Sequence, residues 1–229
     1  MEITKHRFKG VYQIKEEDRP GVEIATVNLS PGTRVYGERI IRHSGREYRI
    51  WDPYRSKLSA AIHKGLSEMP ISPGSRVLYL GAASGTTASH VSDIIGEDGK
   101  IFCVEMSSRT MRELITLCER RKNMIPILGD ARKPWEYSSL VGYSDVIYQD
   151  VAQPDQAKIA LENAKRLLKP GGFAIIAIKS RSIDVTKDPR EIFKEEVRKI
   201  ERGGFEVIEV KRLDPFEKDH AIILGRFEG

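Results

Sequence analysis

From residue 77 onward, short unbroken apolar runs alternate with stretches in which apolar residues recur every three or four positions. The runs expected to be strands are 77–80, 101–105, 125–128, 146–149 and 173–178. One helical face, following Ser107, is expected to carry Met111, Leu114, Ile115 and Cys118. Unbroken apolar strands separated by amphipathic helices are typical of a parallel sheet covered on both faces. The pattern therefore predicts a doubly wound α/β sheet.

The two ends of the chain follow other patterns. Apolar runs at 205–210 and 221–227 with a short link between them predict a closing hairpin. Short apolar clusters separated by turn residues predict strands near 8–14, 22–27, 35–36, 40–41 and 48–50. Residues 55–68 have helical spacing. We therefore expect a small antiparallel β domain over residues 1–52 and the α/β domain over residues 53–229.

Composition narrows the class of protein. The 229 residues carry 38 Lys and Arg against 33 Asp and Glu, a charge of +5, so we expect only weak RNA binding unless partners contribute. No apolar stretch reaches the length of a membrane span, and the N-terminus lacks a signal-peptide pattern, which predicts a cytoplasmic location. Cys103 and Cys118 are expected to be reduced core thiols. No His, Cys and Asp cluster has ligand spacing, so no metal is expected.

The first strand of the α/β region is followed by a turn of small residues, Gly81-Ala-Ala-Ser-Gly-Thr-Thr87. A strand, a tight turn and a helix start let a ligand approach bare backbone, and the free N–H groups of the helix favour anionic groups. Glu105 ends the next strand, about 20 positions further on, where an acidic residue commonly holds ribose hydroxyls. These features predict a nucleotide- or nucleoside-binding turn.

Charged residues follow the later strands as well. Asp130 follows the third strand, Asp150 the fourth and Lys179 the fifth, and the carboxyl ends of parallel strands meet at one edge of a sheet. An NAD-dependent dehydrogenase is an alternative function, although the turn does not match G-x-G-x-x-G and no set of residues for hydride transfer is present. S-adenosylmethionine has no pyrophosphate and needs an acid for its ribose and a polar residue near adenine. Glu105 and Asp130 suit these two roles.

Several segments together resemble archaeal members of the fibrillarin family. They are Trp51–Lys57, Leu80–Thr87, Asp150–Gln153, Lys179–Asp184 and Asp214–His220. The resemblance covers nearly the whole chain and implies a Rossmann-like S-adenosylmethionine-dependent methyltransferase sheet with a small N-terminal antiparallel β domain. It implies methylation of ribose 2′-hydroxyls of rRNA and tRNA within a box C/D guide ribonucleoprotein. The partners implied are the guide RNA and target RNA, a Nop-domain scaffold protein and a kink-turn-binding ribosomal-type protein.

The resemblance also implies roles for individual residues. Contacts to S-adenosylmethionine would come from Gly81, Ala83, Thr86, Thr87, Glu105, Met106, Asp130, Ala131, Asp150, Val151, Ala152 and Gln153. A catalytic tetrad would fall on Lys57, Asp150, Lys179 and His220. In this hypothesis Lys179 directs its amine at the attacking 2′-oxygen, Asp150 orients it, and Lys57 favours its neutral form. His220 would complete the hydrogen-bond set.

Ordinary alternatives exist for these residues and for the function. Asp150 could cap the helix after Pro154, His220 could be an edge-strand histidine, and the two lysines could be solvated side chains. A non-catalytic scaffold could keep the same fold, although the intact glycine turn and tetrad positions argue against degeneration. Protein glutamine methylation, an activity of eukaryotic relatives, is a lesser alternative. The glycine/arginine-rich extension of those relatives is absent, which indicates an archaeal form.

Overall fold

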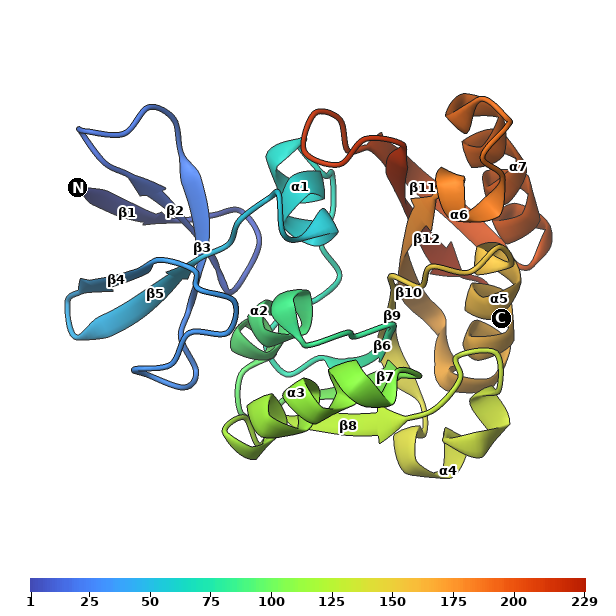
Figure 1. Cartoon of the computed structure of the whole chain (residues 1–229), viewed down its shortest axis with the longest axis horizontal. Helices are drawn as coiled ribbons and strands as arrows, with labels where there is room; N and C mark the ends of the chain where they lie inside the picture. The colour runs from blue at the N-terminus through green and yellow to red at the C-terminus, as the bar shows by residue number, and fades with distance from the viewer.

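The computed structural model describes all 229 residues and contains two sheets (Figure 1). The five-stranded sheet has the order β1-β2-β3-β5-β4, and every neighbouring pair is antiparallel. Its strands are β1 (Glu2–Lys5), β2 (Val11–Lys15), β3 (Glu23–Val27), β4 (Ile40–His43) and β5 (Arg46–Ile50). In Figure 1 this sheet forms the blue end of the molecule, beside helices α1 and α2.

The seven-stranded sheet has the order β11-β12-β10-β9-β6-β7-β8. Its strands are β6 (Arg76–Leu80), β7 (Lys100–Glu105), β8 (Met124–Leu128), β9 (Ser144–Gln149), β10 (Leu168–Lys179), β11 (Phe205–Arg212) and β12 (His220–Phe227). The strands from β10 to β8 run parallel, whereas β12 is antiparallel to both of its neighbours. The predicted α/β sheet and its closing hairpin are confirmed.

Helices cover both faces of this sheet. They are α1 (Lys57–His63), α2 (Thr86–Ile95), α3 (Ser108–Glu119), α4 (Ser138–Val141), α5 (Gln156–Leu167), α6 (Ser180–Ile183) and α7 (Pro189–Arg202), with a short 3-10 turn η1 (Pro134–Glu136). Val77 and Tyr79 of β6 belong to the core under α1, α2 and α3, while Leu78 and Leu80 belong to the core under α5 and α7. Both faces of β6 are therefore buried, which explains its unbroken apolar run. None of the helices combines the length and the apolar character needed to cross a bilayer.

The structure corrects three expectations from the periodicity. The helix expected over 55–68 is confined to Lys57–His63, because Asp52 to Arg55 form a turn in which the Arg55 N–H bonds to the Asp52 carbonyl at 3.2 Å. Residues 35–36 are not a strand, since their N–H groups donate to the Glu38 carboxylate. Ile115 is 43 % exposed although it shares the apolar spacing of α3.

A buried carboxylate joins the two sheets. Asp93 of α2 accepts hydrogen bonds from Arg49 of β5 at 2.7 Å and from Arg121, which follows α3, at 2.6 Å. Arg49 also donates to Glu38 at 2.6 Å. The side chains of Asp93, Arg49 and Arg121 have no exposed surface, so each charge depends on its partners for stabilisation. The boundary between residues 52 and 53 stays a prediction. The network shows that the first sheet is packed against α2 and the segment after α3.

Loss of that carboxylate should destabilise the whole fold. We expect Asp93→Asn to lower the free energy of unfolding by about 3–5 kcal/mol, because the buried Arg121 guanidinium would lose its only counterion and the buried Arg49 would keep only Glu38. The exposed Asp98, in the turn after α2, offers the matched control Asp98→Asn, expected to change stability by less than about 0.5 kcal/mol. Urea unfolding followed by circular dichroism compares them. Equal stabilities of the two variants would contradict the proposed role of Asp93.

His90 of α2 makes stability depend on pH. Its ring is fully buried, lies stacked on Trp51 with centroids 4.9 Å apart, and hydrogen-bonds to Thr26 and Tyr36. Burial, reinforced by the nearby Arg49 and Arg121, lowers the pKa of His90 well below its usual 6.5. The unfolded chain therefore takes up this proton more readily than the folded chain, and the folded state loses stability as the pH falls below 6.5.

We expect the free energy of unfolding to decrease by about 1–2 kcal/mol between pH 7 and pH 5 through this histidine. His90→Gln should flatten the decrease, even if the variant is less stable at pH 7, because it removes the titrating ring. Urea unfolding at several pH values in this range measures the slope. An unchanged slope in the variant would show that another group causes the dependence.

Candidate active site

A cavity of about 260 Å³ opens at the carboxyl ends of β6, β7, β8 and β9. Of the residues expected to contact a cofactor, those lining it are Gly81, Ala83, Glu105, Met106, Asp130, Ala131, Asp150, Val151, Ala152 and Gln153. Lys179, expected to be catalytic, lines it as well. Sequence reasoning missed Val104, Gly129 and Ile159, whose apolar or small side chains carry no chemical signal. The parallel register brings these strand ends together.

Gly81 allows two strand ends to approach closely. It has a left-handed φ of +80°, and a Cβ built on it would lie 2.9 Å from the carbonyl oxygen of Asp150. Such a contact is too short for any side chain, and a non-glycine residue is strained at this φ. A glycine is therefore required at the end of β6 so that the backbone after β9 can lie against it.

Glu105 fastens the glycine turn to the neighbouring strand. One oxygen of its buried carboxylate accepts the Ala83 N–H at 2.8 Å, and the other accepts the Ser107 N–H at 2.7 Å. A carboxylate oxygen can accept more than one hydrogen bond, so both oxygens can still accept from a ligand hydroxyl pair. Glu105 therefore lies at the cavity wall, holds the turn in place through its two hydrogen bonds, and can accept further hydrogen bonds from a ligand.

The rim of the cavity is polar on one side. Asp130 uses one carboxylate oxygen to accept the Arg132 N–H at 2.9 Å. The Arg132 guanidinium donates to the Gln153 side-chain oxygen at 2.7 Å, which fixes that amide at the rim. Met106 is 56 % exposed, and its sulfur lies 3.6 Å from the Gln153 nitrogen. This side therefore offers a carboxylate, an amide and a soft apolar contact to a ligand.

Thr86 and Thr87 do not line the cavity. Thr87 is buried, and its hydroxyl donates to Ser56 Oγ at 2.9 Å. Ser56 caps α1, because its Oγ accepts the Ser59 N–H at 3.3 Å. Thr87 therefore links the glycine turn to the first turn of α1, where Lys57 stands. Sequence spacing placed this hydroxyl near the turn but could not tell which side it faces.

Asp150 brings two lysines from distant parts of the chain together. Lys179 Nζ, at the end of β10, lies 2.8 Å from Asp150 Oδ1 and donates to the Asp150 carbonyl at 2.9 Å. Lys57 Nζ, from α1, donates to Asp150 Oδ2 at 3.3 Å. The three side chains are largely buried. Asp150 does not cap α5, whose N-cap residue is Asp155.

His220 lies beside this cluster. It pairs with Lys179 in the register of β12 and β10, and its Nδ1 lies 2.6 Å from the Lys218 carbonyl. A carbonyl only accepts, so Nδ1 carries the proton and Nε2 is the free acceptor when the ring is neutral. Burial, together with the Lys57 ammonium, lowers the pKa of His220 below 6.5. The ring is therefore mainly neutral at pH 7.

The hydrogen-bond set differs from the expected one in two respects. His220 makes no hydrogen bond to Asp150 or to either lysine. Instead, Glu217 lies between them, with its carboxylate 3.9 Å from Lys57 and 3.7 Å from His220. Sequence reasoning missed Glu217, although it stands within the Asp214–His220 segment singled out above. Its charge partly offsets that of Lys57.

The fold and the cavity define a class of protein. A mainly parallel sheet with an antiparallel strand near one edge, a glycine turn and a carboxylate after the second strand form a Rossmann-like nucleoside-binding fold. The same fold occurs in a SAM-dependent methyltransferase from Aquifex aeolicus, with a TM-score of 0.55 and 18% identity, covering 76% of this chain and 91% of that one. The class is a methyltransferase-type α/β fold.

The Fibrillarin family model matches residues 3–229, and the chain belongs to the fibrillarin family. The fibrillarin-like rRNA/tRNA 2′-O-methyltransferase of Pyrococcus furiosus is 59% identical over 226 residues, 99% of both chains. Aeropyrum pernix fibrillarin in complex with natively bound S-adenosyl-L-methionine has a TM-score of 0.92 and 53% identity, covering 98% of both chains. The chain matched in a fibrillarin/Nop5p complex has a TM-score of 0.87 and 41% identity, covering 97% of this chain and 100% of that one.

The Thr87 hydroxyl can be tested through stability. We expect Thr87→Val to lower the free energy of unfolding by about 1–2 kcal/mol, because the buried Ser56 hydroxyl loses its donor. Thr86→Val is the matched control, since the Thr86 side chain makes no hydrogen bond, and its effect should stay below about 0.5 kcal/mol. Urea unfolding measures both, and similar effects for the two variants would contradict the structural role of Thr87.

Proposed function

We propose that this protein is an S-adenosylmethionine-dependent RNA ribose 2′-O-methyltransferase and the catalytic subunit of a box C/D guide ribonucleoprotein that modifies rRNA and tRNA. One observation carries the proposal most directly: an amine and a carboxylate, Lys179 and Asp150, meet at 2.8 Å at the wall of a nucleoside-type cavity. Membership of the fibrillarin family along almost the whole chain supports the same function.

The cavity residues fit S-adenosylmethionine chemically. Glu105 has acceptor capacity for the two ribose hydroxyls, Asp130 can accept from an adenine amino group, and the bare turn at Gly81 can accommodate the methionine part. When bound, the cofactor supplies an electrophilic methyl group. The natively bound S-adenosyl-L-methionine in the structure of Aeropyrum pernix fibrillarin, which is 53% identical, supports this assignment.

The lysine cluster would act on the attacking oxygen. A ribose 2′-hydroxyl must shed its proton during attack, and its pKa lies far above that of side-chain bases, so positioning and electrostatics should supply most of the rate. Lys179 has donor capacity left after its contacts with Asp150 and lines the cavity. It can therefore direct an N–H at the 2′-oxygen and stabilise the charge that develops there. Asp150 fixes that amine, and Lys57 adds a second cation on the same carboxylate.

Partners should supply both affinity and target choice. A charge of +5 gives little sequence-independent affinity for RNA, so guide pairing is proposed to select the nucleotide. A relative solved in a fibrillarin/Nop5p complex supports a Nop-domain scaffold as the partner. The guide RNA and a kink-turn-binding ribosomal-type protein are proposed from the family resemblance. A cytoplasmic location stays a prediction.

The decisive experiment is a methylation assay with purified partners. The protein is combined with guide RNA, scaffold and kink-turn-binding protein, and transfer from tritiated S-adenosylmethionine is mapped to the labelled ribose. We expect robust transfer to one ribose with the complete set and little with the protein alone. A protein that binds no cofactor in calorimetry and transfers no methyl in the full complex would instead be a non-catalytic scaffold.

Within that assay Lys179→Met should reduce methyl transfer by roughly 10²- to 10⁴-fold, because the variant keeps the bulk of the side chain but loses the amine. Binding of S-adenosylmethionine, measured by calorimetry, should be retained. Lys165→Met, on the exposed face of α5, makes the same chemical change away from the cavity and should leave transfer unchanged. Transfer at the normal rate by the Lys179 variant would refute the proposed role of its amine.

A further inference from the structure

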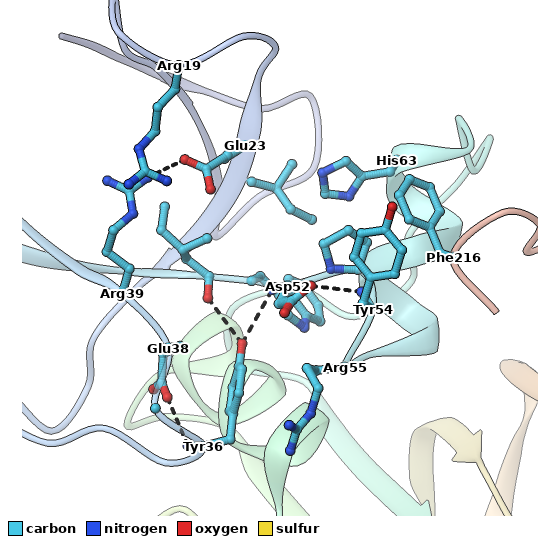
Figure 2. A pocket seen from close by; sticks show the side chains of 15 residues that line it. Arg19, Glu23, Tyr36, Glu38, Arg39, Asp52, Tyr54, Arg55, His63 and Phe216 are labelled. Carbon is cyan, nitrogen blue, oxygen red and sulfur yellow. Dashed lines mark hydrogen bonds and ion pairs between the residues drawn. The ribbon is translucent and has the colours of Figure 1, made fainter.

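The loop between β11 and β12, residues 213–219, lies beside α1 and the lysine cluster (Figure 1). It contributes to the wall of a second cavity, of about 580 Å³, whose other lining residues come from the first sheet, from the segment after it and from α1. Figure 2 shows Phe216 of this loop next to Tyr54 and His63 in that wall. Glu217 follows Phe216 directly. The loop therefore brings a carboxylate close to the lysine cluster.

Aromatic and backbone contacts fix the position of this loop. The Phe216 ring packs edge to face on Tyr54, with centroids 5.2 Å apart and an interplanar angle of 73°. On α1, the His63 ring lies 5.7 Å from Phe216. Leu213, at the start of the loop, is fully buried in the core under α1, and its carbonyl accepts the Glu217 N–H at 3.2 Å. These contacts attach the loop to α1 and orient Glu217.

The Glu217 carboxylate faces two members of the predicted tetrad. One of its oxygens lies 3.9 Å from Lys57 Nζ, and the other lies 3.7 Å from His220 Nδ1. Both distances exceed that of a hydrogen bond, so Glu217 acts on these groups through its charge. The three side chains are largely buried, and partly buried charges are screened much less by solvent than exposed ones.

The ion pairs of the cluster are shared unevenly. Lys57 has two carboxylates within ion-pair distance, those of Asp150 and Glu217, whereas Lys179 has only that of Asp150. The two ammonium groups and the two carboxylates balance each other, and the His220 ring is mainly neutral at pH 7. Without Glu217, one positive charge in this largely buried cluster would have no counterion, and both lysines would depend on Asp150 alone.

We propose that Glu217 is a positioning residue for the methyl transfer: it takes part of the charge of Lys57, so that Asp150 keeps the Lys179 amine directed at the attacking 2′-oxygen. The contacts with Asp150 agree with this role, since Lys179 Nζ lies 2.8 Å from the carboxylate and Lys57 Nζ lies 3.3 Å from it. The inference rests on the proposed function, which assigns Lys179 to the 2′-oxygen.

The reconstituted guide complex tests the charge of Glu217. Glu217→Gln should lower kcat by roughly tenfold or more, because small displacements of a group that acts on the reacting atoms are costly. The KM for target RNA and the affinity for S-adenosylmethionine should not change, since Glu217 lines neither cavity. Asp214→Asn is the matched control: it removes the same charge from the same loop, where Asp214 pairs with Arg212 at 2.8 Å, and it should leave kcat unchanged.

The attachment of the loop gives an independent test. Phe216→Ala removes the ring that holds the loop against α1 and should also lower kcat. Combined with Glu217→Gln, it should cost little more than the larger of the two single effects, because both changes remove the same contact. Phe216→Tyr keeps the ring and should behave like the wild type. Effects on kcat that multiply in the double variant would show that the two residues act separately and would overturn the inference.

His220 reports the Glu217 charge without any activity measurement. Burial and the Lys57 ammonium lower the pKa of His220, whereas the carboxylates of Glu217 and Asp150 oppose this effect. The remaining charged neighbour is Lys179, which pairs with His220 across β10 and β12. Two phenols near Asp150 complete the surroundings of the cluster, and burial raises their pKa values well above 10.0, so they stay neutral during the titration: Tyr79 and Tyr148.

Glu217→Gln should therefore lower the pKa of His220 further, as followed by NMR titration of the imidazole in the isolated full-length protein. Asp214→Asn should leave this pKa as it is in the wild type. A His220 pKa that does not respond to Glu217→Gln would contradict the placement of the carboxylate.

The remaining outcomes separate this inference from the proposed function. A raised KM for target RNA with unchanged kcat in Glu217→Gln would show that Glu217 contacts RNA and does not position the lysines. Normal methyl transfer by this variant would refute the inference alone. Absence of transfer by the wild-type complex would refute the proposed function and the inference with it.

Discussion

The site depends on one carboxylate that is shared by two ammonium groups. Asp150 holds Lys179 from the end of β10 and Lys57 from the start of α1. The strand β10 pairs with β9 and β12 and has no backbone pairing with α1 that would align the two lysines. Opposite charges in a largely buried position attract strongly enough to fix long, flexible side chains that would otherwise sample many rotamers. The position of Asp150 is itself set by Gly81, because only a residue without a side chain lets the two strand ends meet.

A second carboxylate connects that site to the rest of the chain. Asp93 anchors Arg49 of the first sheet and Arg121 after α3 within one buried network. The segment that links β5 to α1 begins at Trp51, whose ring stacks on His90 of α2 beside this network. The same short link then presents Tyr54 and Arg55 and ends at the capping residue of α1. The first sheet therefore contributes to the site through the position of this link.

The cavity at the strand ends, the smaller of the two, holds the groups that the proposed reaction requires. The smaller one is built from strand ends and offers fixed acceptors such as Glu105, which already fastens the glycine turn. Lys179 and Asp150 stand at its wall, so the lysine cluster lies directly beside the space proposed for the cofactor.

The sequence by itself determined the α/β sheet and the strand-end residues, because apolar runs define buried strands and parallel strands must end at the same edge. Glu105, Asp130, Asp150 and Lys179 follow from that rule, and His220 and Lys57 came from family resemblance. Only the tertiary structure decided that Thr87 faces Ser56, that Glu217 stands between Lys57 and His220, and that residues 35–36 turn toward Glu38. Periodicity fixes the face of a residue on its own element, whereas its partner depends on how separate elements pack, which local sequence does not encode.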